Sequence, residues 1–396
     1  MPLTSSLLAL ALGTTNDATK LEIKTDVDTR FRFERRTDRD FLSTNRDNRS
    51  DLFTRFRPGV TLTYGQWVSQ LRLQYSQSLR WTSTGNGSTE NRDLDLGYIQ
   101  YKGETGTFTI GRFKLNFGNE RLIGGSEWTN MSRSFDGIRY QSGKLDVFAA
   151  KIGVQANRPK DARIAGVRYA NKFGDTMYIL KTDEVGAGDV TIHTLNHHWK
   201  GNFGKAKADI EVSGQVGEVG PRDHSAYAVT ANFTVPVNPQ LSVGLIGNIA
   251  TGGQSAGHTK TFDTLYPTAH KFNGSADLQG FRNMQELTFF ANYKTDPNGS
   301  LKVSYHNFWL FDDTDAWYGV TGAPNARFGG TFVDATGASG SEVGSEIDIE
   351  YTRSFGKNGT FALGFAVFEP GDFIKSLVGG TSKRSTWGYA QYSIKF

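Results

Sequence analysis

Arginine recurs on alternate residues in the first part of the chain. Arg30 and Arg32 stand two residues apart in TRFRFE, and Arg55 and Arg57 stand two apart in TRFRPG. A guanidinium is always charged and binds carboxylate or phosphate groups through paired N–H donors. Where such arginines face a water-filled passage they favour anionic solutes, and acidic neighbours orient them and loosen their hold, so that a solute can leave.

The stretch 111–140, GRFKLNFGNERLIGGSEWTNMSRSFDGIRY, gathers the same chemistry between aromatic residues and paired glycines. It contains Arg112, Arg121, Arg133 and Arg139, with Asp136 among them. We interpret it as an outward strand, an inward-folding loop and a return strand at the narrow part of a pore.

Alternation assigns a barrel face to Arg139, the last arginine of this stretch, more clearly than to Arg112, the first. Arg139 points inward because Ile138 beside it takes the opposite, lipid-facing side. Arg112 shares a face with Phe108 and Ile110 unless a bulge intervenes, and the neighbouring glycines are candidates for that bulge.

Two other groups contain residue types that serve catalysis or metal binding. The histidines of TIHTLNHHWK, at 191–200, suggest a metal site, but alternation sends neighbouring residues to opposite faces, which favours wall positions. Asp223, His224 and Ser225 are hydrolase-type residues, but adjacency in sequence is not the geometry of a triad. We therefore expect no enzyme activity, no catalytic residue, no structural metal site and no cofactor.

A third group is acidic. Asp312, Asp313 and Asp315 in FDDTDAWYG offer oxygen ligands of the kind that calcium prefers, but no full EF-hand spacing follows. A solvated loop is favoured, and calcium binding stays open. The glycines of GTFTIGR lack the strand-to-helix context of a nucleotide site.

Composition excludes several classes of protein. The chain has 396 residues, 37% of them hydrophobic, and its mean hydropathy is −0.45. It has no apolar run of roughly 18 residues, which excludes an α-helical membrane protein. A barrel wall needs apolar residues only at alternate positions, so a low mean hydropathy is compatible with membrane insertion. The net charge of +4, spread over 44 basic and 40 acidic residues, argues against nucleic-acid binding.

Strict alternation of apolar and polar residues is the main structural signal. It runs over fourteen residues in LEIKTDVDTRFRFE, at 21–34, which a helix cannot imitate. It recurs at 67–81, where Trp67 and Trp81 end the apolar face. Fourteen steps of ~3.3 Å, tilted by ~40°, span roughly 35 Å, enough to put one tryptophan near each lipid interface.

The same rule predicts eighteen strands, or sixteen if two short runs are misread. They lie near 21–36, 50–64, 67–81, 92–103, 105–117, 134–142, 144–154, 162–172, 175–185, 190–202, 205–217, 224–236, 239–251, 284–296, 299–312, 341–355, 359–370 and 385–396.

The links between these strands differ in length. Tight, turn-forming links such as Tyr64-Gly65-Gln66 connect the strands at one end. Longer links are expected at 37–49, 82–91, 118–133, 252–283, 313–340 and 371–384. Short periplasmic turns and long extracellular loops are typical of an outer-membrane barrel. The pattern predicts an all-β fold, a single transmembrane antiparallel up-and-down β-barrel. It does not decide whether loops 252–283 and 313–340 plug the lumen.

The two ends of the chain agree with this localisation. Residues 1–20 have an apolar core at 7–12 and look like a signal-peptide remnant or a disordered N-terminus. Residues 21–396 are expected to form the barrel domain. The last strand, STWGYAQYSIKF, ends on Phe396, and a terminal aromatic residue resembles the signal that the outer-membrane barrel-assembly machinery recognises.

Eighteen strands enclose more space than side chains can fill, so a water-filled lumen is expected. By parity, the inward cations include Arg30, Arg32, Arg55, Arg57, Arg72, Arg80, Arg139, Arg168, Lys200, Lys294 and Lys302. The inward acids include Asp26, Asp28, Glu34, Asp93, Asp95, Glu286, Glu346, Asp348 and Glu350. For a single residue a solvated polar wall is the simpler interpretation. For the arginines as a group we favour anion selectivity.

Three blocks resemble the bacterial alginate-export porin family: the stretch 111–140, LYPTAHKFNGSADLQGFRN at 265–283, and FEPGDFIK at 368–375. The resemblance implies a monomeric outer-membrane barrel, typically of eighteen strands, with an electropositive constriction that passes acidic polysaccharide outward. It places Arg112, Arg133, Asp136 and Arg139 at the pore, as lining or bracing residues. On the same resemblance, Lys271 and Arg282 lie at the base of a large loop that could fold inward.

Three functions remain open. The first is passive diffusion of anionic poly- or oligosaccharide, as in the export family. The second is general or small-solute uptake on the same scaffold, and the third is a barrel-embedded enzyme or an adhesin. The expected partners are outer-membrane lipid and lipopolysaccharide, the assembly machinery and an anionic saccharide, with no nucleic acid. Neither the solute nor the direction of transport follows from the sequence.

Overall fold

The computed structural model describes residues 20–42, 47–154, 162–185, 188–327, 329–380 and 382–396. Nearly all of the expected signal-peptide remnant therefore lies outside the described residues. In the described part of the chain, no helix is both long and apolar enough to cross a membrane.

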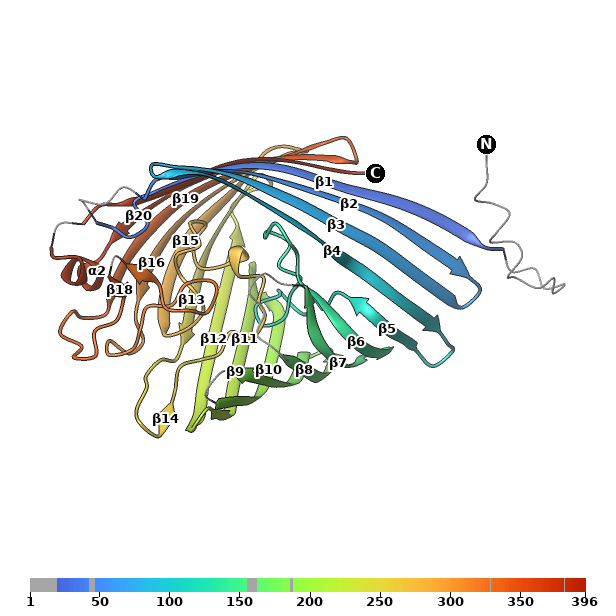
Figure 1. The fold of residues 1–396 in the computed structure, drawn as a ribbon, viewed down its shortest axis with the longest axis horizontal. Coiled ribbons are helices and arrows are strands. Elements are labelled where there is room, and N and C mark those ends of the chain that lie inside the picture. The colour runs from blue at the N-terminus through green and yellow to red at the C-terminus, as the bar shows by residue number, and fades with distance from the viewer. Residues whose placement is uncertain (1–19, 43–46, 155–161, 186–187, 328, 381) are drawn as a thin grey trace.

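Eighteen strands form one closed antiparallel barrel, in which each strand pairs with its neighbour in the chain and β21 pairs with β1 (Figure 1). The barrel strands are β1 (Glu22–Thr37), β2 (Arg49–Tyr64), β3 (Trp67–Thr82), β4 (Gly85–Lys102), β5 (Thr107–Phe113), β6 (Ser134–Ser142), β7 (Leu145–Val154), β8 (Arg163–Asn171), β9 (Gly174–Val185), β10 (Gly188–Phe203), β11 (Ala206–Val219), β12 (Arg222–Pro236), β13 (Leu241–Ala250), β15 (Met284–Asp296), β16 (Gly299–Trp309), β19 (Glu342–Phe355), β20 (Gly359–Pro370) and β21 (Ser385–Lys395).

Alternation places the two faces of β1 as the sequence predicts. On β1, Phe31 and Phe33 are 50% and 45% exposed on the outward face. Arg30 and Arg32, between them, are each 3% exposed on the inward face. The outward apolar residues form the surface that lipid would cover.

The strand ends differ most from prediction at two places. β4 begins at Gly85, so the long loop expected at 82–91 is wrong: a tight turn joins β3 to β4, and the polar residues read as a loop pair with β3. Polar residues can continue a ladder where a hairpin extends past the apolar belt. β5 ends at Phe113, four residues earlier than expected, and the chain then turns into the barrel.

The two ends of the barrel are built differently. At one end every connection has two to four residues. At the other, long loops span 114–133, 251–283, 310–341 and 371–384. These loops contain β14 (His258–Thr259), the 3₁₀ helix η1 (Ala269–Lys271), β17 (Ala326–Arg327), β18 (Gly330–Thr331) and α2 (Asp372–Leu377).

The long loops pack against the inward face of the wall. Trp317 and Phe332 from loop 310–341 are fully buried against Phe41, from the β1–β2 connection. Phe41 and Trp317 both contact Phe368, an inward residue of β20. This end of the barrel therefore has an aromatic core made of loops and wall together.

A charge placed in the outward belt tests this arrangement. Leu73 is 52% exposed near the middle of β3. We expect Leu73→Arg to lower the free energy of unfolding from a bilayer by about 2–4 kcal/mol, since a cation at the midplane must leave water. Urea titration of barrels folded into lipid vesicles measures the loss.

Asn86→Arg is the matched control, because Asn86 pairs with Trp81 on the same face at the long-loop end. The expected loss there is about 0–1 kcal/mol. Equal losses at the two positions would contradict the assignment of the belt.

Candidate functional site

Loop 114–133 lies inside the barrel against β1 and β2. The Arg30 guanidinium donates to the carbonyl oxygens of Glu127 at 2.8 Å and Thr129 at 3.0 Å. Arg32 donates to the carbonyl of Trp128 at 2.7 Å, and its guanidinium lies 3.7 Å from the Trp128 ring centre. Backbone carbonyls of an irregular loop have no ladder partner, so these arginines supply the donors that the loop needs.

The next strand holds the same loop. Arg55 donates to the Glu127 carbonyl at 2.9 Å. Arg57 contacts the Glu127 carboxylate at 2.8 Å and the Asp28 carboxylate at 2.6 Å. We refer to Arg30, Arg32, Arg55 and Arg57 as the arginine clamp; each is at most 5% exposed.

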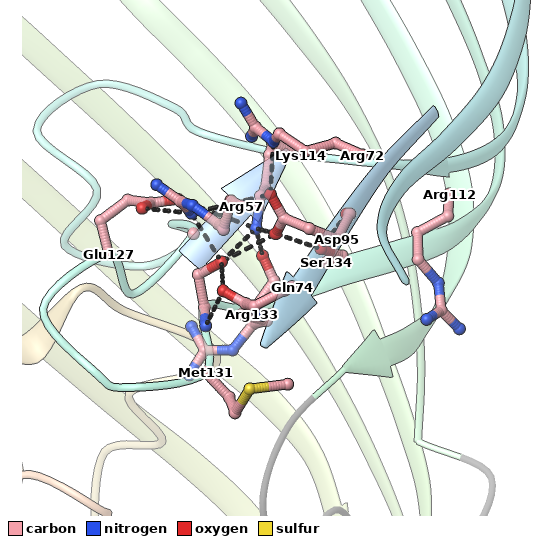
Figure 2. A network of polar contacts seen from close by, with 12 residues as sticks. Arg57, Arg72, Gln74, Asp95, Arg112, Lys114, Glu127, Met131, Arg133 and Ser134 are labelled. Carbon is pink, nitrogen blue, oxygen red and sulfur yellow. Dashed lines mark hydrogen bonds and ion pairs between the residues drawn. The ribbon is translucent and has the colours of Figure 1, made fainter. Parts of the chain in front are cut away.

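Asp95 joins the clamp to the beginning of the loop (Figure 2). Its buried carboxylate accepts hydrogen bonds from Arg72 at 2.8 Å, Lys114 at 2.6 Å and Ser132 at 2.8 Å. A register shift makes this geometry: Arg72 pairs with Leu96 and the next residue of β3 pairs with Leu94, so Asp95 is the extra residue of a bulge.

Loop 251–283 docks on loop 114–133. The Gly124 amide donates to the Tyr266 carbonyl at 2.9 Å, and the Tyr266 amide donates to the Leu122 carbonyl at 2.8 Å. Lys271 forms an ion pair with Glu120 at 2.6 Å, which joins the same two loops. The two loops therefore share a short backbone ladder inside the barrel.

Arg133 reinforces that junction. Its buried guanidinium donates to the carbonyl oxygens of Gly124 at 2.9 Å and Pro267 at 3.0 Å, and also to that of Tyr266. Burial lowers the pKa of Arg133 to about 10, so the side chain remains charged at neutral pH. Arg133 braces the loops and does not line open water.

A second part of the wall, on β15, β16 and β19, is acidic and holds loop 251–283; β19 is separated from β1 by β20 and β21. The Asp348 carboxylate accepts from the Ser275 amide at 3.0 Å, and the Glu346 carboxylate accepts from the Ala276 amide at 2.8 Å. His306 on β16 lies 2.8 Å from the Glu286 carboxylate. We refer to Glu286, Glu346 and Asp348 as the acidic wall. Glu346 and Asp348 bind loop amides, whereas the arginine clamp binds loop carbonyls.

Loop 310–341 completes the constriction. Arg282 donates to the Gly322 carbonyl at 3.1 Å, and its guanidinium lies 4.6 Å from the Tyr318 ring centre. The Trp317 indole donates to the Gln279 side-chain oxygen at 2.8 Å. Loops 251–283 and 310–341 are therefore bonded to each other, and Arg282 sits at their junction.

The remaining predicted wall cations are inward and ion-paired, and Arg139 also contacts loop 114–133, with its guanidinium 5.5 Å from the Phe117 ring centre. Arg139 forms a two-point contact with Asp146, at 2.9 and 2.5 Å. Arg168 pairs with Asp175 at 2.6 Å near the short turns. Arg80 pairs with Asp51 at 2.9 Å. Whether any of these residues meets a solute stays a prediction.

The expected inward positions of Arg112 and Asp136 are wrong. The register of β5 runs without a shift from Thr107 to Phe113 against both neighbours, so no bulge turns Arg112 inward. Arg112 shares the outward face with Ile110, which is 51% exposed, and binds Asp136 through two contacts at 2.6 and 2.7 Å. Figure 2 shows Arg112 standing apart from the Asp95 network. The bulge lies instead in β4, the strand that precedes β5 and pairs with it.

The histidines and the hydrolase-type residues do not converge among the described residues. His198 points inward to Asp209 at 2.7 Å, while His193 contacts Tyr178 on the outward face at 2.6 Å. His224 is buried in the wall, whereas the Ser225 hydroxyl contacts another histidine on the other face.

The acidic group in loop 310–341 is dispersed too. Asp315 accepts from the Gly253 amide at 3.0 Å and from the Tyr318 hydroxyl at 2.9 Å. The Asp312 carboxylate accepts a hydrogen bond from the Thr314 amide within its own turn. No group of three metal-type side chains gathers within the described part of the chain.

A closed eighteen-stranded barrel with a lipid-facing belt and inward loops that narrow its bore defines an outer-membrane porin channel. The family model for alginate export matches residues 22–387, and the chain belongs to that family. A search of curated proteins returned no match. In the family's setting the short turns are periplasmic and the long loops extracellular.

Solved structures with the same fold include several porins. Pseudomonas aeruginosa OccK5 (OpdH) is similar at a TM-score of 0.60 and 12% identity, covering 95% of this chain and 98% of its own. The outer membrane protein OprD from Pseudomonas aeruginosa is similar at a TM-score of 0.62 and 14% sequence identity, and the match covers 94% of each chain. Acinetobacter baumannii OccAB4 is similar at a TM-score of 0.63 and 10% sequence identity, and the match covers 96% of this chain and 100% of OccAB4. At these identities the likeness concerns the fold.

The arginine clamp makes a direct prediction. Arg30→Gln combined with Arg55→Gln removes four donor contacts to the backbone of loop 114–133. Since hydrogen bonds from a charged group contribute about 1.5–3 kcal/mol each, the loop should loosen. We expect faster amide exchange at 126–131 and larger, noisier single-channel currents.

Arg49→Gln combined with Arg80→Gln is the control, because these arginines lie on the same wall and pair with Asp51. Unchanged exchange and current in the clamp variant, or equal changes in the control, would show that the clamp does not hold the loop.

Proposed function

We propose that this porin passes short acidic saccharides, with uronate oligomers as the substrate class, along a cationic wall of its constriction. This proposal is supported mainly by the net positive charge of the arginine clamp together with its ion-pair partners. The ion-paired network around the clamp contains eight cations and six carboxylates: Arg30, Arg32, Arg36, Arg55, Arg57, Arg72, Lys114 and Lys395 against Asp26, Asp28, Glu34, Asp95, Glu127 and Asp277. A fixed excess of positive charge beside a narrow aqueous path raises the local concentration of anions.

Membership in the alginate-export family supports the same substrate class. The role of the arginines differs from a simple charged ring, however. The clamp is buried and acts on a solute through its field, while Glu127, with 44% of its side chain exposed, meets the water directly. A cationic field softened by one exposed carboxylate attracts an acidic sugar without trapping it.

A second candidate function rests on a different observation. Three loops inside the barrel are bonded to one another and to two parts of the wall, which narrows the bore and holds the loops in place. A narrow fixed bore favours small-solute uptake over passage of a long polymer. The two candidates therefore differ in the length of solute that passes.

The other roles remain proposals. We propose that the chain is a channel and not an enzyme, and the dispersal of Asp223, His224 and Ser225 supports this. We propose a monomer without nucleic acid whose last strand is read by the barrel-assembly machinery, and the exposure of Phe396, at 68%, supports access to that residue.

Channel recording with oligosaccharides of graded length separates the two candidates. We expect oligouronates of a few residues to interrupt the current, and maltodextrins of equal length to do so far less, because only the former carry carboxylates. Relief of the block at higher voltage would show that the sugar passes through. Equal block by charged and neutral sugars would overturn the acidic substrate class. Passage of long polyuronate would reject a bore restricted to small solutes.

Selectivity can be tested with two arginines that differ mainly in the face they occupy. The side chains of Arg72, on the inward face, and Arg112, on the outward face, are 18% and 17% exposed, and both are ion-paired. A unit charge about 10 Å from the ion path in water contributes about 0.4 kcal/mol, roughly twofold in relative permeability. We expect Arg72→Gln to lower anion preference by that order in a salt gradient, and Arg112→Gln to leave the reversal potential unchanged. A shift with Arg112→Gln alone would reverse our assignment of the two faces.

A further inference from the structure

A polar groove lies on three adjacent strands, β10, β11 and β12, near their periplasmic ends (Figure 1). Two rows of residues form it, and within each row the residues lie directly opposite one another across the ladders. The row nearer the constriction is Lys200, Asp209 and Asn232. The row nearer the short turns is Asn202, Lys207 and Thr234. All six line a groove of about 440 Å³, within the range of roughly 300–1,000 Å³ that small-molecule sites occupy.

The first of these rows also holds the tip of loop 114–133. The Asn119 side-chain amide donates to the Asp209 carboxylate at 2.9 and 3.0 Å. Lys200 donates to the Asn119 side-chain oxygen at 2.7 Å and forms an ion pair with Asp209 at 3.2 Å. Because this loop lies inside the barrel, the groove faces the lumen. It lies between the anchored loop tip and the periplasmic mouth.

The charges in the groove are divided between its two rows. Asp209 is the only carboxylate that lines the groove among the described residues, and Lys200, Asn119 and His198 all bind it. Lys207, in the other row, is exposed, and within the described part of the chain its ammonium group forms no ion pair or hydrogen bond. The groove therefore presents one available cation beside two side-chain amides and a hydroxyl group.

This combination selects a class of ligand. An ammonium group binds a carboxylate through a charge-assisted hydrogen bond. Side-chain amides both donate and accept hydrogen bonds, as sugar hydroxyls do. A neutral sugar would leave the cation unused, and a small inorganic anion would leave the amides unused. A uronate unit, with one carboxylate and several hydroxyls, uses both.

We propose that this groove binds one uronate unit of an acidic saccharide on the periplasmic side of the constriction. The sugar carboxylate binds Lys207, and its hydroxyls bind Asn202 and Asn232. A unit held there lies directly beside the anchored tip of loop 114–133, so the groove is the last binding site before the constriction on that side. The inference rests on the acidic substrate class proposed above, and it adds a site on a part of the wall that the arginine clamp does not reach.

Single-channel recording with a mannuronate trimer, added to one chamber at a time, tests the groove. We expect Lys207→Gln combined with Asn232→Ala to weaken block from the periplasmic side about tenfold, because a charge-assisted contact and an amide contact are lost. Block from the extracellular side should stay as in the parent channel. Asn232→Ala alone should shorten each periplasmic block event with every charge intact, which electrostatic attraction by itself would not produce.

Lys294→Gln combined with Asn292→Ala is the matched control. These residues are an inward lysine and an inward asparagine on β15, near the same mouth, and neither lines the groove. Heat-modifiable migration on gels establishes that each variant is folded, and Asn232→Ala decides the matter if the double variant does not fold.

The outcomes separate this site from the proposed substrate class. Equal weakening by the two double variants would overturn the groove, since a general charge effect of the mouth would explain it. Block of the groove variants that equals block of the parent would also overturn the groove and leave the substrate class intact. Absence of block of the parent from either side would contradict the substrate class itself, and the groove with it.

Discussion

The contact between buried guanidinium groups and the backbone carbonyls of loop 114–133 is the interaction on which the constriction depends. An irregular segment inside a barrel carries amides and carbonyls that no ladder satisfies, and leaving them bare in a buried site costs about 1–3 kcal/mol each. Together, Arg30, Arg32 and Arg55 supply donors to three successive carbonyls of the loop, those of residues 127, 128 and 129. The guanidiniums benefit in turn, because burial of a charge is tolerated only with such partners.

The acidic wall, a few strands further around the barrel, satisfies the loop amides in the same way. Glu346 and Asp348 accept from amides of loop 251–283, and the two loops then pair with each other through Gly124 and Tyr266. Cations on one part of the wall thus bind loop carbonyls, and carboxylates on a second part bind loop amides. This division also leaves positive charge concentrated on the side of β1 to β3, which links the anchoring of the loops to the proposed preference for anions.

Much of the barrel follows from the sequence, because the period-two alternation and the turn residues are local signals. Most strand positions and the inward faces of Arg30, Arg57 and Arg72 were predictable in this way. The function of the clamp was not, because it depends on carbonyls about 70 to 100 residues away in the chain. Arg112 was misplaced because the glycine beside it suggested a bulge that lies in β4, where Asp95 breaks the register. Asp95 was predicted to face inward, but the sequence did not predict that its carboxylate would bind Arg72, Lys114 and Ser132 together.

The most direct test asks whether loop 114–133 lies in the conducting path beside positive charge. The chain has no cysteine, so Thr129→Cys places a single thiol on the exposed tip of that loop. Modification of single channels by negatively and positively charged thiosulfonates can be followed as steps in current. We expect a stepwise fall in conductance. We also expect the anionic reagent to react faster than the cationic one, once each rate is divided by the rate of that reagent with a free thiol in solution. Modification without any change in conductance, or a clear preference for the cationic reagent, would contradict our account of the constriction.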